Sequence, residues 1–218
     1  KNNTNLSAWT LSKIKGRNYI IPRTRGNLDS ALMVRKDWLD KLGLEVPETT
    51  EEFAAMIEAV VTADPDGNGV NDTIGLIPSV ENIDGYWPAA FGTRDIERNE
   101  EGGIIYERFT DNYGDYVEYM RSLYAKGAVA KEFALIKGQQ QEELFTTGKS
   151  VTFVKNAWHL YRMNEECKKT DPNAEVILIP CLKGPKGYAH VYDLGYFGGM
   201  AISSKCSEEK VKRILKFF

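Results

Sequence analysis

The stretch TTEEFAAMIEAVVTADPDGNGVND, from Thr49 to Asp72, joins an amphipathic helix to an acidic turn. Thr49 and Glu52 have the spacing of a capping box, in which the Thr hydroxyl and the Glu carboxylate each bind a free backbone N–H at the helix start. The helix that follows repeats apolar residues at i, i+3, i+4, i+7 and i+8, which predicts one face packed against a core. The apolar residues of this stripe are Phe53, Met56, Ile57, Val60 and Val61.

The residues after this helix, DPDGNGVND, form an acidic turn. Counted from Asp64 as position 1, residues with side-chain oxygens occupy positions 1, 3, 5 and 9, and a glycine occupies position 6, as in a calcium-binding EF-hand loop. Gly75 replaces the bidentate Glu of position 12, so the EF-hand is incomplete. Two interpretations stay open. The segment is either a turn that ends the helix, or a structural site in which a Ca²⁺ ion offsets the repulsion between neighbouring carboxylates. The candidate ligands are Asp64, Asp66, Asn68, the Val70 carbonyl and Asp72.

Helical and strand-like segments alternate on both sides of this stretch, which favours an α/β layered fold. Helices are predicted where apolar residues follow the helical period, and strands where β-branched residues gather between turns. Residues 79–110, with Gly, Asn and many charges, are predicted to be loop-like. The predicted helices cover 34–43, 49–61, 111–127, 139–147 and 207–218, and the predicted strands cover 17–23, 32–34, 73–78, 149–154, 174–180 and 198–204.

Composition excludes several classes of function. The 218 residues carry a net charge of −3 without a Lys/Arg cluster, so nucleic acid is not an expected partner. No apolar run approaches the roughly 18 residues of a membrane span. The cysteines, Cys167, Cys181 and Cys206, form no CxxC pair, and their odd number argues against a disulfide framework. The last predicted helix ends on two aromatic residues without a cap, so we expect the chain to be a segment of a longer protein.

The sequence contains no recognisable catalytic motif. TTGKS, at 146–150, lacks the first glycine of a phosphate-binding loop and precedes a predicted strand. The two histidines, His159 and His190, stand outside any HExxH pattern, and no GxSxG is present. The paired carboxylates of a glycoside hydrolase meet only in the folded protein, so a secreted glycan-active hydrolase stays an alternative.

Aromatic residues supply the remaining candidates for ligand binding. Sugar rings have apolar C–H faces that stack on aromatic rings, while nearby polar groups meet their hydroxyls in a concave site. The alternative is that these rings belong to the core, because large aromatic side chains are mostly buried. Three pairs lie in or beside loop-like segments: Tyr86 and Trp87, Trp158 and Tyr161, and Tyr196 and Phe197.

Five segments occur in a recognisable order: RKDWLDKLGLEVPETTEEF, DPDGNGVNDTIGL, LYAKGAVAKEF, LFTTGKSVTFVKNAW and GYFGGMAISSKCSEEKVKRILKFF. Together they resemble the extracellular solute-binding protein family 1, and more narrowly the cell-surface lipoproteins that deliver oligosaccharides to ABC transporters. The resemblance implies a type II periplasmic-binding-protein-like fold, in which two α/β lobes joined by a hinge hold the ligand in the cleft between them. Because members of the family are longer, residues 1–218 are expected to form one lobe or an incomplete two-lobe fragment, with 79–110 as a hinge or loop region.

The resemblance also implies a function. It implies an extracellular oligosaccharide-binding subunit of an ABC importer, which is not an enzyme and has no organic cofactor. The sugar would pass to the membrane permease subunits, and the longer protein would be a cell-surface lipoprotein. We expect a monomer. A peptide- or lipid-binding surface protein on the same scaffold stays a second alternative, because a fold does not determine a function.

Site residues follow from the resemblance as well. It implies that Trp158 and the pair Tyr196 and Phe197 stack on the sugar, and the further candidates are Arg25, Tyr86 and Trp87. In relatives that bind calcium, a loop like DPDGNGVND wraps the ion. Those relatives often carry an acid directly after the last Asp, and this chain departs from that pattern with Thr73.

Overall fold

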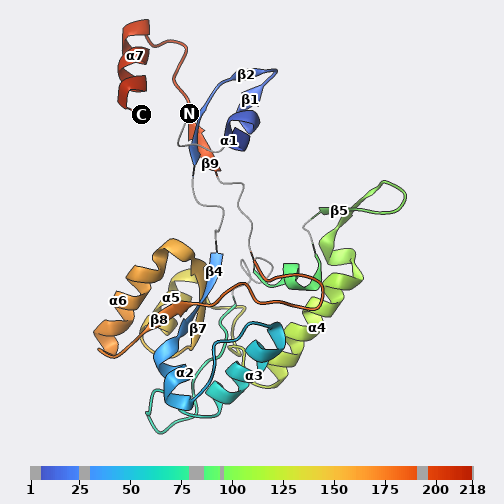
Figure 1. The fold of residues 1–218 in the computed structure, drawn as a ribbon, viewed down its shortest axis with the longest axis vertical. Coiled ribbons are helices and arrows are strands. Elements are labelled where there is room, and N and C mark those ends of the chain that lie inside the picture. The colour runs from blue at the N-terminus through green and yellow to red at the C-terminus, as the bar shows by residue number, and fades with distance from the viewer. Residues whose placement is uncertain (1–5, 25–29, 79–85, 94–95, 191–195, 218) are drawn as a thin grey trace. The chain divides into compact units, whose positions relative to one another are not determined.

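The computed structural model describes residues 6–24, 30–78, 86–93, 96–190 and 196–217 (Figure 1). The chain divides into two compact units. The larger unit is Leu28–Val191, and the smaller unit combines Lys1–Asn27 with Tyr192–Phe218.

A three-stranded antiparallel sheet forms the centre of the larger unit. Its order is β7-β4-β8, with β4 (Ser30–Arg35) between β7 (Thr152–Asn156) and β8 (Val176–Leu178). In β4, Leu32 pairs with Val154 of β7, and Val34 pairs with Ile177 of β8. Five consecutive residues of β4 are buried, because this strand has a neighbour on each side and packed side chains on both faces.

Two hydrophobic clusters lie on the two faces of this sheet. Successive side chains of a strand point to opposite faces, and β4 accordingly sends Leu32 and Val34 into the larger cluster and Met33 into the smaller one. The larger cluster contains the apolar stripe of α3 (Thr50–Val61), with Phe53 and Ile57 fully buried. The smaller cluster is formed by Met33, Phe145, Phe153, Met163, Cys167, Ala174 and Val176.

The predicted helices are present in the larger unit. They are α2 (Lys36–Leu42), α3, α4 (Asp111–Ala125) and α5 (Gly138–Thr146). The capping box of α3 is confirmed: the Thr49 hydroxyl accepts from the Glu52 N–H at 3.1 Å, and the Glu52 carboxylate accepts from the Thr49 N–H at 3.2 Å. Gly43 ends α2 with a φ of 66°, a left-handed conformation that glycine adopts without strain.

Three features differ from the sequence predictions. Residues 73–78 form isolated bridges instead of a strand, because Ile74 pairs with Ser150 while Leu76 pairs with Val129, so no single neighbour runs alongside. The predicted loop contains a hairpin of β5 (Ile96–Arg98) and β6 (Ile104–Tyr106), after the 3-10 helix η1 (Pro88–Phe91). Helix α6 (Leu160–Thr170) was not predicted, because it buries only Met163 and Cys167, which is a weak apolar signal. The hinge role of 79–110 stays a prediction.

The smaller unit pairs segments from the two ends of the chain. Strand β3 (Ile21–Thr24) runs antiparallel to β9 (Tyr196–Met200), with Ile21 opposite Met200. The unit also contains α1 (Leu6–Leu11), α7 (Glu208–Phe217), and the short pair β1 (Lys13–Ile14) and β2 (Arg17–Asn18). The predicted strand over 17–23 is therefore two strands, β2 and β3.

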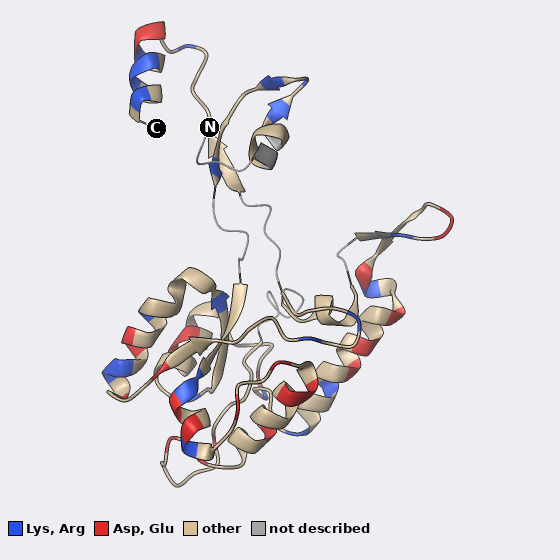
Figure 2. Ribbon diagram, viewed as in Figure 1, with Lys and Arg blue, Asp and Glu red and all other residues tan. Residues whose placement is uncertain are grey.

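Two further features concern charge and the membrane. In Figure 2, acidic and basic residues both occur along α6, whereas α4 carries its acidic residues before its one basic residue, Arg121. A search of the described residues finds no helix with the length and apolar character needed to cross a bilayer.

Candidate functional site

Trp158 lies in the 3-10 helix η3 (Ala157–His159), between β7 and α6. Strand β7 fixes the start of this segment, because it pairs with the buried strand β4 over five residues. The indole is 53% exposed, and Tyr161 in the first turn of α6 is 78% exposed. Two large aromatic rings, three residues apart in the sequence, are thus exposed to solvent. They follow a strand that belongs to the central sheet.

Ion-paired side chains and a histidine lie near Trp158. Glu142 of α5 forms ion pairs with Arg162 of α6 at 2.6 Å and with Lys155 of β7 at 3.2 Å. The hydrogen bond from Arg162, followed by that from Lys155, lowers the pKa of Glu142 to about 2. Burial and then the positive charges of Arg162 and Lys155 lower the pKa of His159. His159 is therefore neutral at pH 7, with one ring nitrogen as a donor and the other as an acceptor.

Tyr196 and Phe197 belong to β9 of the smaller unit. Tyr196 is half-buried opposite Thr24 of β3, and Phe197 is exposed. The Arg23 guanidinium lies 5.5 Å from the centre of the Phe197 ring, within the range of a cation–π contact. The ligand role of these two aromatic residues stays a prediction.

Tyr86 and Trp87 are core residues, which corrects the expectation that they offer faces to a ligand. Trp87 is 2% exposed, and its ring centre lies 4.8 Å from that of Phe53 and 6.3 Å from that of Tyr119. Tyr86 packs edge-on against Trp87 at 5.1 Å, and burial raises its pKa. These rings fill space between α3, α4 and η1, so neither has a free face. The remaining candidate, Arg25, lies outside the described residues.

The acidic loop is folded around the carboxylate of Asp64. This carboxylate accepts from the backbone N–H groups of Asn68 at 3.1 Å and Gly69 at 2.9 Å. Gly67 and Gly69 have φ values of 70° and 79°, which explains the glycines at these positions. The Lys41 ammonium donates to the Pro65 carbonyl at 2.7 Å and ties the loop to α2. These contacts confirm that the segment is a compact turn after α3.

Three of the predicted metal ligands converge in this loop. The Asn68 amide donates to Asp66 at 2.8 Å and to Asp72 at 2.9 Å. The ammonium of Lys149 lies 3.2 Å from Asp72 and 3.7 Å from Asp66. The Asn68 side chain, and next Lys149, lower the pKa of Asp72, while Asp72 raises the pKa of Lys149. A positive charge therefore already stands beside the two carboxylates.

The residues present fit a hard cation in part. Asp66, Asn68 and Asp72 bring oxygen-bearing side chains to one place, and the Lys149 ammonium is a stand-in for a cation there. The Val70 carbonyl accepts from the Asp72 N–H at 3.0 Å. Within the described parts of the chain, no three His, Cys, Asp or Glu side chains already surround a common metal position. Cation binding would thus require the Asn68 amide to turn its oxygen inward.

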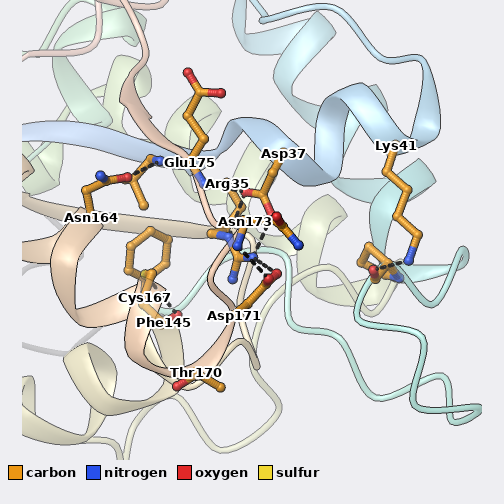
Figure 3. A network of polar contacts seen from close by, with 12 residues as sticks. Arg35, Asp37, Lys41, Phe145, Asn164, Cys167, Thr170, Asp171, Asn173 and Glu175 are labelled. Atoms are coloured by element: carbon orange, nitrogen blue, oxygen red, sulfur yellow. Dashed lines mark hydrogen bonds and ion pairs between the residues drawn. The ribbon is translucent and has the colours of Figure 1, made fainter.

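A buried arginine lies close to the acidic loop in the larger unit. Arg35, at the end of β4, is 1% exposed, stacks 4.6 Å from the Trp38 ring and binds the carboxylates of Asp37 and Asp171 (Figure 3). It borders a polar groove of about 610 Å³ that Asp66 also lines. Because both neighbouring carboxylates offset the guanidinium charge, we interpret this network as structural.

Two residues of this region were not among the predicted site residues. The sequence shows that Tyr161 is aromatic, but its exposure near Trp158 emerges only from the fold. In the sequence, Lys149 belongs to TTGKS, which gives no sign of a contact with the acidic loop. Its contact with Asp72 joins positions 77 apart, and no local pattern signals such a pairing.

The chain has sequence relatives among known proteins. No protein-family model matches the chain. The polygalacturonan/rhamnogalacturonan-binding protein YtcQ of Bacillus subtilis is 32% identical over 211 residues, which are 94% of this chain and 42% of YtcQ. The lipoprotein LipO of the same organism is 29% identical over 216 residues, covering 94% of this chain and 43% of LipO. The chain therefore spans less than half the length of these curated relatives.

The fold of the chain is also similar to that of a solved structure. The ABC-transporter substrate-binding protein FusA of Streptococcus pneumoniae, in complex with kestose, is 26% identical with a TM-score of 0.59, covering 85% of this chain and 39% of FusA. A second FusA structure is of an EF-hand mutant in complex with fructo-nystose, with 25% identity and a TM-score of 0.58. The predicted periplasmic-binding-protein-like α/β fold is confirmed. YtcQ and FusA are binding proteins by name, and this chain is a homologue of the substrate-binding proteins of ABC transporters.

Proposed function

We propose that this chain is part of an extracellular subunit that binds oligosaccharides for an ABC importer. The exposed Trp158 on the β7–α6 junction is the observation that carries the proposal. The sugar-binding names of YtcQ and FusA support it. The longer protein would act as a monomeric cell-surface lipoprotein that passes its sugar to membrane permease subunits, and residues 79–110 would contribute a hinge or loop region.

The chemistry of the site would be stacking combined with hydrogen bonding. The Trp158 indole offers an apolar face to the C–H face of a sugar ring, and neutral His159 can both donate to and accept from hydroxyl groups. Phe197, whose ring is exposed, and its neighbour Tyr196 stay candidates for stacking on a sugar in the smaller unit. Closure of two lobes around the ligand would exclude water from these contacts.

Calorimetry tests this proposal. The longer protein that contains this chain is titrated with galacturonan oligomers, kestose and a maltooligosaccharide. We expect one of them to bind, and we expect Trp158→Ala to weaken that binding by about tenfold or more, because tryptophans that a ligand covers are among the residues that contribute most to binding. Tyr188 has the same exposed fraction of 53%, so Tyr188→Ala is a matched control that leaves binding unchanged. A flat titration with every glycan, or equal binding by Trp158→Ala, contradicts the proposal.

We propose further that binding occurs without turnover. YtcQ and FusA are binding proteins, and the Glu142 carboxylate is held in ion pairs with Arg162 and Lys155. Prolonged incubation with the bound oligosaccharide should leave its chain length unchanged in chromatography. Release of shorter sugars, lost on substitution of an acidic residue, would identify a hydrolase instead.

We also propose that the acidic loop binds a structural Ca²⁺ ion. Asp64, Asp66, Asn68, the Val70 carbonyl and Asp72 would hold it, and the ion would offset their charge and pin the end of α3. Support comes from the convergence of Asp66, Asn68 and Asp72, and from the EF-hand in FusA.

Thermal unfolding tests the calcium proposal. Millimolar Ca²⁺ should raise the melting temperature of chelator-treated protein by about 5 °C, as expected for a ligand well above its Kd. Asp72→Asn should abolish the rise, because it removes one of the charged ligands of the loop. An unchanged melting temperature of the wild-type chain at millimolar Ca²⁺ would remove calcium from the proposal.

A further inference from the structure

Lys149 reaches the acidic loop from a distant part of the chain. It lies between α5 and β7, and its backbone is held on both sides: its N–H donates to the Leu144 carbonyl at 2.8 Å, and its carbonyl accepts from the Ile74 N–H at 2.9 Å. Both the α5 end and the segment after the loop therefore fix its position. From this fixed backbone position the side chain brings its ammonium to 3.7 Å from Asp66 and 3.2 Å from Asp72.

The charges of the loop explain why a cation is needed there. Asp64, Asp66 and Asp72 bring three carboxylates into nine residues. Backbone N–H groups serve Asp64, whereas Asp66 and Asp72 face each other across the Asn68 amide. The ammonium of Lys149 stands within ion-pair distance of both of these carboxylates. An opposite charge at this distance offsets their mutual repulsion.

We propose that Lys149 is a built-in counter-ion of the acidic loop, which a divalent cation must displace to bind between Asp66 and Asp72. This inference rests on the calcium site proposed above. A divalent cation beside a retained ammonium would meet strong repulsion, so metal binding and the Lys149 contact exclude each other. The loop consequently keeps its shape without metal, and its affinity for Ca²⁺ is lower than its carboxylates alone would provide.

The neutral variant Lys149→Gln tests the inference on the purified chain. Calorimetric titration with CaCl₂ after chelation should show binding about fivefold tighter than in the wild type, the change expected when a weak exposed ion pair no longer competes. Without metal, the melting temperature of the variant should fall, because Asp66 and Asp72 lose their counter-ion. A structural role alone would lower stability without tightening Ca²⁺ binding.

Two further variants keep this test decisive. Lys149→Arg retains the charge and should bind Ca²⁺ within about twofold of the wild type. Lys126→Gln is the matched control, since Lys126 is similarly exposed and pairs with Glu58 at 2.8 Å, away from the loop. It should leave the Ca²⁺ affinity unchanged.

The outcomes separate the inference from the calcium site on which it rests. If the wild type binds Ca²⁺ and Lys149→Gln binds it with unchanged or weaker affinity, the proposed competition between Lys149 and Ca²⁺ is wrong. The calcium site itself is then still supported. Absence of Ca²⁺ binding in both proteins overturns the site and the competition together. The glycan titrations of the Trp158 variants are independent of either result.

Discussion

Arg35 and Asp171 are 136 residues apart in the sequence, yet the guanidinium Nη2 of Arg35 lies 3.0 Å from the Oδ2 of Asp171. The same guanidinium forms two hydrogen bonds with Asp37, at 2.8 Å and 2.6 Å (Figure 3). Arg35 therefore joins the central strand β4 to the start of α2 and to the segment after α6. We therefore expect this buried charge network to hold the three segments together in addition to their apolar packing.

Arg35→Met should destabilise the larger unit by about 3 kcal/mol, because it leaves two carboxylates without their partner. The partial exposure of Asp171 places the effect at the low end for a buried pair. Arg121→Met is the control, since Arg121 forms an exposed pair with Glu118, and should change stability by less than about 0.5 kcal/mol. Urea unfolding followed by tryptophan fluorescence measures both. Equal losses in the two variants would show that the Arg35 network does not stabilise the fold.

Truncation of Trp87 and truncation of Trp158 should change the free energy of unfolding by very different amounts. Trp87→Ala leaves a cavity beside Phe53 and Tyr119, and should lower the free energy of unfolding by about 3–5 kcal/mol. Trp158→Ala removes an exposed ring and should change it by less than about 0.5 kcal/mol. Chemical denaturation of the two variants compares them directly. A large loss in Trp158→Ala would mean that this indole is structural, and would weaken its assignment to the sugar site.

The ion pairs of Glu142 should make stability depend on pH in the acidic range. The pKa of Glu142 is about 2 in the folded protein, against an ordinary value of 4.5. The stabilisation is therefore fully present above about pH 4.5, and is lost as the pH falls toward 2, where the folded-state carboxylate takes up its proton. Melting temperatures of the wild type and Glu142→Gln should differ at pH 7 and converge near pH 2. A difference that stays constant from pH 7 to pH 2 would contradict this assignment.

The cysteines should differ in their reaction with a thiol reagent. Burial raises the pKa of Cys167 to about 11, whereas Cys181 is exposed and Cys206 is half-buried. At pH 8, only about 0.1% of Cys167 is thiolate, the reactive form. Native protein should therefore label at Cys181 and Cys206, and Cys167 should label only after denaturation, as followed by peptide mass spectrometry. Equal labelling rates at the three positions in native protein would contradict the burial of Cys167.

Several parts of the fold could be predicted from the sequence because their signals are local. The α3 capping box joins residues three apart, and the apolar stripe of α3 repeats within single helical turns. Gly43 marks the end of α2 for the same reason, through the conformation of one residue. Helix α6 and the β5–β6 hairpin were missed, since each buries too few apolar residues to leave a pattern.

The sequence by itself determined helices α2 to α5, the acidic turn and the family resemblance, because these depend on the residue types within short windows and on their order. Only the tertiary structure decided which aromatic rings are available: Trp87 lies in the core, and Trp158 faces solvent. It alone also placed Lys149 against Asp72 and Arg35 against Asp171. Exposure and long-range charge pairing depend on segments that meet only when the chain folds, so no neighbouring residue carries their signature.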